Sequence, residues 1–147
     1  MNSEDLIIKN IKKDFFSLRN GVIAQTLCKL YPEGKIIYGL NVPQFIDLAK
    51  KYPKSLSLGL KLWEDKNYRD SRLFALYLLP PSEIDKDTAR KMVMDVESSE
   101  IAEFLPFRLL RHLPYAAELC KELSEIKYSD KLVNYCIKMF QKNLDQI

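Results

Sequence analysis

The sequence contains few of the residues that build several common kinds of site. Among its 147 residues are one histidine, three cysteines and four glycines. His112 and the cysteines, Cys28, Cys120 and Cys136, lack the spacing typical of zinc ligands, and so few glycines form no glycine-rich phosphate loop. We therefore expect no metal and no cofactor, and three free thiols of the kind found in a reducing cytoplasm.

Long apolar runs are also absent. No run approaches the roughly 20 residues that span a bilayer, and the N-terminal stretch MNSEDLIIKNIKKDFF lacks the positive-then-apolar order of a signal peptide. A hydrophobic fraction of 47% without any low-complexity tract indicates a folded chain. The length suits one domain over residues 1–147, which we expect to be cytoplasmic and not bound to a membrane.

The net charge of +3 is unevenly distributed along the chain. Residues 1–75 contain 13 basic and 8 acidic side chains, a balance of +5, whereas residues 76–147 contain 10 basic and 12 acidic side chains, a balance of −2. A surface that binds phosphate groups would therefore draw mainly on the first half. The alternative is that these charges belong to ordinary solvated helix faces.

Apolar residues recur at three- and four-residue spacing along most of the chain, which is typical of helices with one buried face. Residues 35–40 are the only strand candidate, and this segment is short. We expect an all-α fold of about eight or nine short helices packed as antiparallel pairs. The first of these helices is predicted to bury Leu6, Ile7, Ile11, Phe15 and Leu18.

Local signals predict where several helices begin and end. The Asn20-Gly21 pair separates the first helix from a second over residues 22–31, and Ser55 is placed to cap the helix that contains Trp63. Pro106 is expected to kink or break a helix near Phe104. Further along, Pro114 is expected to open a helix and Ser129 to cap the last one.

Residues 38–81 carry a series of short motifs in a defined order. They are Tyr38-Gly39-Leu40, Val42-Pro43, Leu48-Ala49-Lys50, Leu58 to Trp63, and Tyr68, Asp70, Arg72 and Ala75. This order resembles the DNA alkylation repair family, the bacterial alkylpurine DNA glycosylases built from HEAT-like repeats. The resemblance implies an α-α superhelix of stacked antiparallel helix pairs (HEAT/ARM-like repeats). Helix pairs that begin near residues 42, 68 and 100 recur at roughly 30 residues, a spacing typical of such solenoids.

The resemblance also implies a place for catalysis. Family members resemble one another in a W-D-x-x-D motif, whose last Asp is thought to stabilise the sugar cation formed as an alkylated base leaves. The best match here is Ser99-Glu100-Ile101-Ala102-Glu103, which makes Glu100 and Glu103 the candidate catalytic residues. The alternative is that both glutamates complement the start of a helix.

Several departures from the motif weigh against catalysis. Ser99 replaces Trp, Glu103 replaces Asp, and Pro106 follows closely. Residues 83–103 carry seven acidic and three basic side chains, a poor surface for a DNA backbone. The chain is also shorter than a full-length glycosylase of this kind. The sequence thus predicts a family member that has lost glycosylase chemistry.

Six basic residues of the first half are candidates for contact with DNA: Lys50, Lys51, Lys54, Lys66, Arg69 and Arg72. Arg69 and Arg72 lie in the segment that matches the family. For Arg72 the alternative is a structural role, either pairing with Asp70 or Glu64 or capping the carboxyl end of a neighbouring helix.

The combined interpretation is a non-catalytic HEAT-like module that binds duplex DNA weakly and without sequence preference, or that binds a protein partner. Two alternatives stay open. One is an active alkylpurine DNA glycosylase of base-excision repair that uses Glu103. The other is a purely protein-binding helical scaffold, since stacked helix pairs commonly have that role.

Overall fold

The computed structural model describes residues 3–145 and shows an all-α fold, as the periodicity predicts. Within these residues there are nine α-helices and three short 3-10 helices, and the strand candidate at residues 35–40 forms only an isolated bridge between Ile36 and Tyr68. Among the described residues, no helix has the length and apolar character needed to cross a membrane. The chain divides between Leu79 and Pro80 into two compact units. The single domain and the HEAT-like repeat stay predictions.

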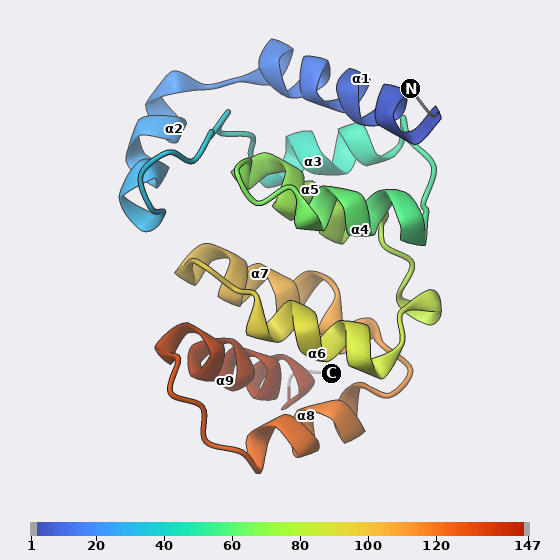
Figure 1. Cartoon of the computed structure of the whole chain (residues 1–147), viewed down its shortest axis with the longest axis vertical. Helices are drawn as coiled ribbons and strands as arrows, with labels where there is room; N and C mark the ends of the chain where they lie inside the picture. Colours follow the sequence, from blue (N-terminus) through green and yellow to red (C-terminus); the bar gives the residue numbers. More distant parts are fainter. Residues whose placement is uncertain (1–2, 146–147) are drawn as a thin grey trace. The chain divides into compact units, whose positions relative to one another are not determined.

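The first unit is built from helices α1 to α5 (Figure 1). Helices α4 and α5 are antiparallel: the Ser55 N–H donates to the Leu78 carbonyl at 3.1 Å, and the Arg72 Nε donates to the Trp63 carbonyl at 2.8 Å. The second helix, expected over residues 22–31, is shorter and ends in a 3-10 turn. The bounds are α1 Ser3–Leu18, α2 Gly21–Leu27, η1 Cys28–Leu30, α3 Val42–Ala49, α4 Leu56–Glu64 and α5 Arg69–Leu78.

Polar side chains cap the start of α2, α3 and α4. The Asn20 side chain accepts the first N–H groups of α2, and Asn41 and Gln44 form a reciprocal capping box at the start of α3. The Ser55 side chain accepts the Leu58 N–H at 3.2 Å, which confirms its predicted capping role. Each cap satisfies N–H groups that have no partner inside the helix.

An aromatic cluster fills the core of the first unit. Phe15 of α1 lies edge-on to Phe45 of α3 and to Phe74 of α5, with ring centroids 6.4 and 5.7 Å apart. The three phenylalanines are at most 2% exposed, and pairs of this geometry add to the energy of area burial. Ile11 and Phe15 are buried as predicted, but Leu6 is 53% exposed. The apolar stripe of α1 is therefore narrower than its sequence pattern indicates.

Gly39 holds the segment between α2 and α3 against the start of α2. Its φ is +87°, and a Cβ atom there would lie 2.7 Å from the carbonyl oxygen of Asn20. The Asn20 N–H also donates to the carbonyl of the preceding residue, Tyr38, at 2.8 Å. A side chain at Gly39 would strain the positive-φ backbone conformation and would clash with the Asn20 carbonyl.

The second unit contains helices α6 to α9 and two 3-10 turns. Its described helices bury a largely aliphatic core that includes Leu105, Leu119 and Phe140. The bounds are η2 Pro81–Glu83, α6 Lys86–Met94, α7 Ser99–Arg108, η3 Leu110–His112, α8 Ala116–Ser124 and α9 Lys131–Asp145.

Two expectations for the second unit are wrong in detail. A kink or a break is expected near Phe104, and the helix is not broken there, because α7 runs through Pro106 to Arg108. Pro106 is itself buried beside Leu105, and this packing offsets the lost helical hydrogen bond. The last helix is capped by Asp130, not by Ser129, since the Asp130 side chain accepts the N–H groups at the start of α9.

Candidate nucleic-acid interface

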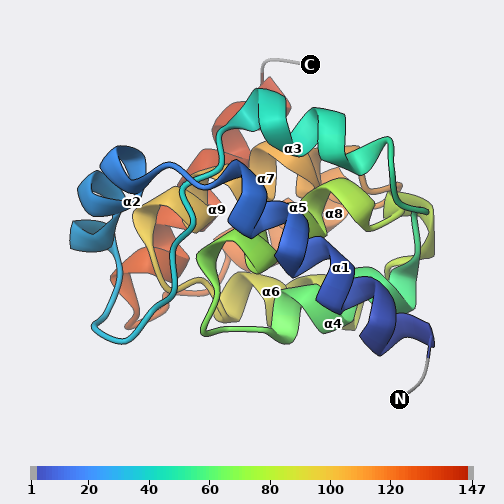
Figure 2. The same ribbon diagram turned by 90° about the horizontal axis from the view of Figure 1, so that it is seen from above.

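A basic groove lies along α1 in the first unit. Its volume is about 560 Å³, within the range typical of ligand sites. Figure 2 shows the segment between α2 and α3, which contributes Tyr38, passing near the C-terminal end of α1. The groove is lined by Lys9, Lys12, Lys13, Phe16, Ser17 and Tyr38.

The order of residues along α1 creates this surface. Its lining positions 9, 12, 13, 16 and 17 follow the spacing of a single helix face. Ile11 and Phe15, on the opposite face, are 0% exposed and anchor the helix to the core. Burial of the apolar face therefore turns the lysines outward. The DNA contacts predicted from the sequence do not include this basic stripe, although the helical period that reveals the apolar stripe also reveals the basic one.

The lysines give the groove its positive charge. Lys12 Nζ lies 3.0 Å from Asp65 Oδ2 and 3.9 Å from the ring centroid of Tyr68, so its charge is partly compensated. Lys9 and Lys13 are exposed and form no ion pair with any other described residue. The ammonium groups of Lys9 and Lys13, together with that of Lys12, which is paired with Asp65, make a surface that attracts anions.

Two aromatic side chains stand among these lysines. Phe16 is 55% exposed, and the guanidinium of Arg19 lies 3.8 Å from its ring centroid. The Arg19 Nη1 also donates to the Phe16 carbonyl at 2.7 Å, which fixes the guanidinium over the ring. Tyr38 stacks on Tyr68 with centroids 6.3 Å apart and planes at 19°. The groove thus presents flat rings beside positive charges.

The environment of Tyr38 keeps its hydroxyl protonated. Burial raises the pKa of Tyr38 above its usual value, and the negative charges that Tyr68, Asp70 and Asp65 can carry raise this pKa further. The hydroxyl is consequently neutral at physiological pH and able to donate a hydrogen bond.

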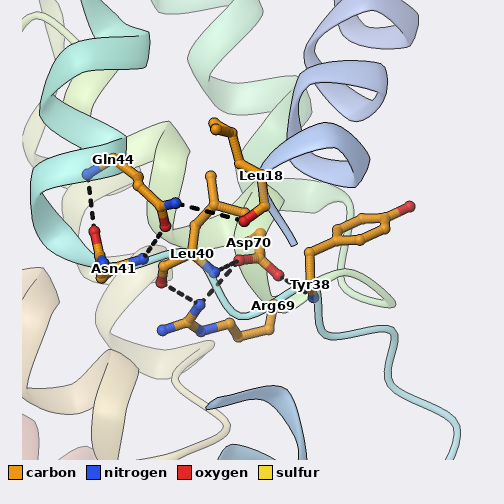
Figure 3. A network of polar contacts seen from close by, with 7 residues as sticks. All are labelled: Leu18, Tyr38, Leu40, Asn41, Gln44, Arg69 and Asp70. Atoms are coloured by element: carbon orange, nitrogen blue, oxygen red, sulfur yellow. Dashed lines mark hydrogen bonds and ion pairs between the residues drawn. The ribbon is translucent and has the colours of Figure 1, made fainter. Parts of the chain in front are cut away.

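A buried carboxylate positions Tyr38 (Figure 3). Asp70 is 0% exposed, and its Oδ2 accepts the Tyr38 N–H at 2.7 Å. Its Oδ1 accepts the Leu40 N–H at 3.0 Å and the Arg69 Nη1 at 2.9 Å. Figure 3 shows the Tyr38 ring directed away from this network. The backbone is therefore held inside the fold while the ring is left to line the groove.

The four lysines predicted to contact DNA are all exposed, but none of them lines the groove. Lys50 Nζ is 3.7 Å from Asp47 Oδ1, and Lys51 Nζ is 3.0 Å from Asp14 Oδ2. Lys54 lies in the loop before α4. Lys66 follows Asp65, the partner of Lys12, and its carbonyl accepts a hydrogen bond from Lys35. Of the four, Lys66 alone is adjacent in sequence to a residue that contacts the groove lining.

The two predicted arginines are buried. Arg69 is 4% exposed and donates to the Leu40 carbonyl at 2.9 Å as well as to Asp70. Arg72 is 0% exposed, with its Nε bonded to the Trp63 carbonyl and its guanidinium 3.9 Å from the Trp63 ring centroid. Because Trp63 lies in the last turn of α4, Arg72 caps the carboxyl end of that helix, which is the structural alternative weighed for it. Neither guanidinium faces solvent, where a DNA phosphate would lie.

The two candidate catalytic glutamates belong to α7 in the second unit. Ser98 caps this helix by accepting the Ile101 N–H at 3.1 Å, and Glu100 lies in the first turn. A carboxylate at this position interacts favourably with the helix dipole. Glu103 is exposed, and its carboxylate accepts a hydrogen bond from the Tyr135 hydroxyl of α9. This bond is the main reason why the pKa of Tyr135 is raised.

Residues 3–145 contain no group of three or more histidine, cysteine, aspartate or glutamate side chains able to hold a metal ion. Cys28 is exposed, whereas Cys120 and Cys136 are buried, and all three are free. Burial raises the pKa of the Cys136 thiol to about 12. A thiol held protonated in this way is a poor nucleophile.

Comparison with known proteins tests the predicted resemblance. A family model described as DNA alkylation repair enzyme matches residues 11–146. The match includes most of the groove lining and both glutamates of α7, and it extends well beyond residues 38–81, which carry the motifs of the resemblance. No curated protein and no solved structure matches the chain at a significant level. The family match covers nearly the whole chain, and on that basis the chain belongs to the DNA alkylation repair enzyme family.

Proposed function

We propose that this protein is a DNA-binding member of its family that does not cleave the glycosidic bond of alkylated purines. The observation that carries the proposal is the groove along α1, where Lys9, Lys12 and Lys13 converge beside Phe16 and Tyr38. Membership of a DNA repair family makes DNA phosphate the anion that such a surface would meet.

The contacts expected here are with the DNA backbone. Ammonium groups on flexible side chains bind phosphate as point charges and read no sequence. We expect non-specific affinity for duplex DNA on the order of 10⁻⁴ to 10⁻⁶ M at physiological salt. Affinity should fall steeply with salt, because each neutralised phosphate releases condensed counterions.

The surroundings of Glu103 support the absence of excision. A carboxylate that stabilises a developing cation is most effective where water is excluded. Glu103 instead is exposed and engaged by the Tyr135 hydroxyl. With serine at position 99, the aromatic side chain that the family motif places beside its acidic residues is also missing.

Binding is tested by fluorescence anisotropy with a labelled duplex over a range of salt concentrations. Replacing both Lys9 and Lys13 by Glu should weaken binding by roughly tenfold or more and lower the salt slope by about two units, one for each lost phosphate contact. The matched control replaces Lys131 and Lys138 of α9, two exposed lysines of the second unit, by Glu. Equal losses in both double variants, or binding that does not respond to salt, would refute the proposed surface.

Excision is tested separately by single-turnover incubation of excess protein with methylated duplex DNA, followed by assay for released base. We expect no release above the spontaneous rate. Release well above that rate, abolished by Glu103→Gln, would establish the alternative of an active glycosylase.

A further inference from the structure

Lysines alone would make the groove a binding site for any polyanion, but its aromatic side chains add a second kind of contact. Phe16 leaves more than half of its surface exposed, although a large apolar side chain at that position gains nothing from water. On α1 it follows Lys12 and Lys13 by one turn, and Arg19, just beyond the end of α1, covers one face of its ring. Tyr38 approaches from the segment before α3 to complete the lining.

We infer that this groove binds unpaired nucleotides of single-stranded DNA in preference to duplex DNA, with bases stacked on Phe16 and Tyr38 and phosphates held by Lys9, Lys12 and Lys13. The inference rests on the proposed function and names the form of DNA that the same site takes. It follows from the pairing of rings with ammonium groups in one groove.

The preference for unpaired bases follows from which surfaces each form of DNA offers. In a duplex the faces of the bases are stacked on one another, so a protein ring reaches them only after unstacking. In a single strand the faces are accessible, and stacking on an aromatic side chain strengthens binding by about 5- to 150-fold per base. Rings are of little use to a surface that contacts only a duplex backbone.

The two rings are held in place before any ligand arrives. Arg19 covers Phe16 at 3.8 Å and is fixed by its bond to the Phe16 carbonyl. Tyr38 is supported by stacking on Tyr68 and by the bond from its N–H to buried Asp70. Rings that are already ordered lose little conformational freedom when a base stacks on them.

The dimensions of the surface suit a short stretch of strand. At a rise of about 1.5 Å per residue, Lys9 and Phe16 are separated by roughly 10 Å along the axis of α1. Each strand of a duplex carries one phosphate per about 3.4 Å of helix axis, and the phosphates of an extended single strand are spaced more widely, so at most about three lie over that distance. The three lysines are therefore sufficient in number to neutralise the phosphates that the groove accommodates.

The experiment compares three labelled ligands of about 12 nucleotides by fluorescence anisotropy at matched salt. They are single-stranded oligothymidine, a duplex, and a strand in which abasic residues replace the nucleotides. Oligothymidine should bind most tightly of the three, since it alone combines phosphates with accessible bases. The abasic strand reports phosphate attraction without stacking.

The variant Phe16→Ala should weaken binding of oligothymidine by about 5- to 150-fold and leave binding of the abasic strand unchanged. Phe107→Ala is the matched control, because Phe107 is 48% exposed and carries the guanidinium of Arg111 at 4.2 Å, but lies in the second unit. Tyr38→Phe retains the ring and should bind nearly as wild type does. Phe16 is exposed, so its loss should leave the melting temperature unchanged.

Different outcomes separate this inference from the proposed function. If the duplex binds as tightly as oligothymidine, or if the abasic strand does so, the inference is overturned while backbone binding by the groove stands. Equal effects of Phe16→Ala and Phe107→Ala would also overturn it. If no form of DNA binds even at low salt, both the inference and the proposed function fail, and the protein-binding scaffold takes their place.

Discussion

The two compact units of this protein place their charged side chains differently. In the first unit Arg69, Asp70 and Arg72 are at most 4% exposed and find their partners inside the fold. Among the described residues of the second unit no charged residue is buried to that extent, although the Glu97 Oε1 and Arg108 Nε atoms are enclosed, and the ion pairs of α6 with α8 lie at the surface. These pairs join Lys86 to Glu118 at 2.8 Å and to Glu122 at 3.3 Å, and Arg90 to Glu122.

This difference follows from how much irregular backbone each unit contains. The first unit contains a long non-helical segment between η1 and α3, and the backbone groups of this segment need partners that helices do not supply. Asp70 provides acceptors for two of its N–H groups, and Arg69 donates to one of its carbonyls. The second unit has shorter connections and relies on apolar packing. The buried charges of Arg69 and Asp70 thus stabilise the irregular segment that carries Tyr38, a residue of the proposed site.

The largest expected effect tests this contrast directly. Asp70→Ala should destabilise the protein by about 3–5 kcal/mol, because it leaves Arg69 as a buried charge without its carboxylate and two N–H groups without acceptors. Glu122→Ala, which removes two surface ion pairs, should lower the free energy of unfolding by only a small fraction of that loss. Denaturant unfolding followed by circular dichroism measures both. Similar losses in the two variants would show that the two units do not differ in this respect.

The next prediction concerns Arg72. Arg72→Lys should lower stability by about 1.5–3 kcal/mol, since the hydrogen bond to the Trp63 carbonyl is charge-assisted and the ammonium lacks the planar group that covers the ring. Trp63 is the only tryptophan, so its fluorescence reports loss of this contact without labelling. Lys54→Ala, at an exposed position, is the control and should change neither property. A fluorescence spectrum unchanged by Arg72→Lys would contradict the role assigned to Arg72.

A smaller effect is expected from the buried thiol of Cys136 in the second unit, on the pH dependence of stability. The pKa of Cys136 is raised to about 12 from 9.0 by burial, so below about pH 9 the thiol is protonated whether the chain is folded or unfolded. As pH rises from 9 to 12, the unfolded chain loses this proton first and the stability contributed by the neutral thiol is progressively lost. Between about pH 8 and pH 10 the unfolding free energies of wild type and Cys136→Ala should converge by about 1 kcal/mol.

Thiol labelling provides an independent check on the same group. In the folded protein Cys28 should react with a water-soluble disulfide reagent well before Cys120 and Cys136, because only Cys28 is exposed. Rapid reaction of all three thiols under native conditions would contradict the buried placement of Cys136. In that case the convergence expected at alkaline pH should also be absent.

The smallest effect is expected at the hydrogen bond between Glu103 of α7 and Tyr135 of α9. Tyr135→Phe removes this exposed hydrogen bond, whereas Glu103→Gln keeps an amide oxygen that can still accept it, so both variants should be close to wild type in stability. Neither variant should change the affinity for DNA, because the proposed contacts are made by α1 and Tyr38. A marked loss of DNA binding in Glu103→Gln would place part of the interface in the second unit.

Much of the fold was predictable because its signals are local. Apolar residues at helical spacing indicated the all-α class, and Ser55 was recognised as a cap because an N-cap depends on residues a few positions apart. Pro106 misled for the opposite reason. Its local effect is to break a helix, but burial of Pro106 and Leu105 outweighs that tendency. Propensity is a weak prior where packing is strong.

The candidate site was predicted less well, because exposure is not a local property. A charge count places a positive balance in the first half but does not distinguish Lys13, which faces solvent, from Arg72, which caps a helix inside the fold. The lysine face of α1 could have been found from its spacing. The contribution of Tyr38 could not, because a carboxylate 32 residues away holds it there.

By itself the sequence determined the helical class, the resemblance to a DNA repair family and the positive balance of the first half, since periodicity, motif order and composition are read along the chain. Only the tertiary structure decided which charged side chains are exposed to solvent and which are buried and stabilise the fold. A buried guanidinium and an exposed ammonium contribute the same unit to net charge. Their difference comes from the carbonyls, carboxylates and rings that folding brings to Arg69 and Arg72 and does not bring to Lys9 and Lys13.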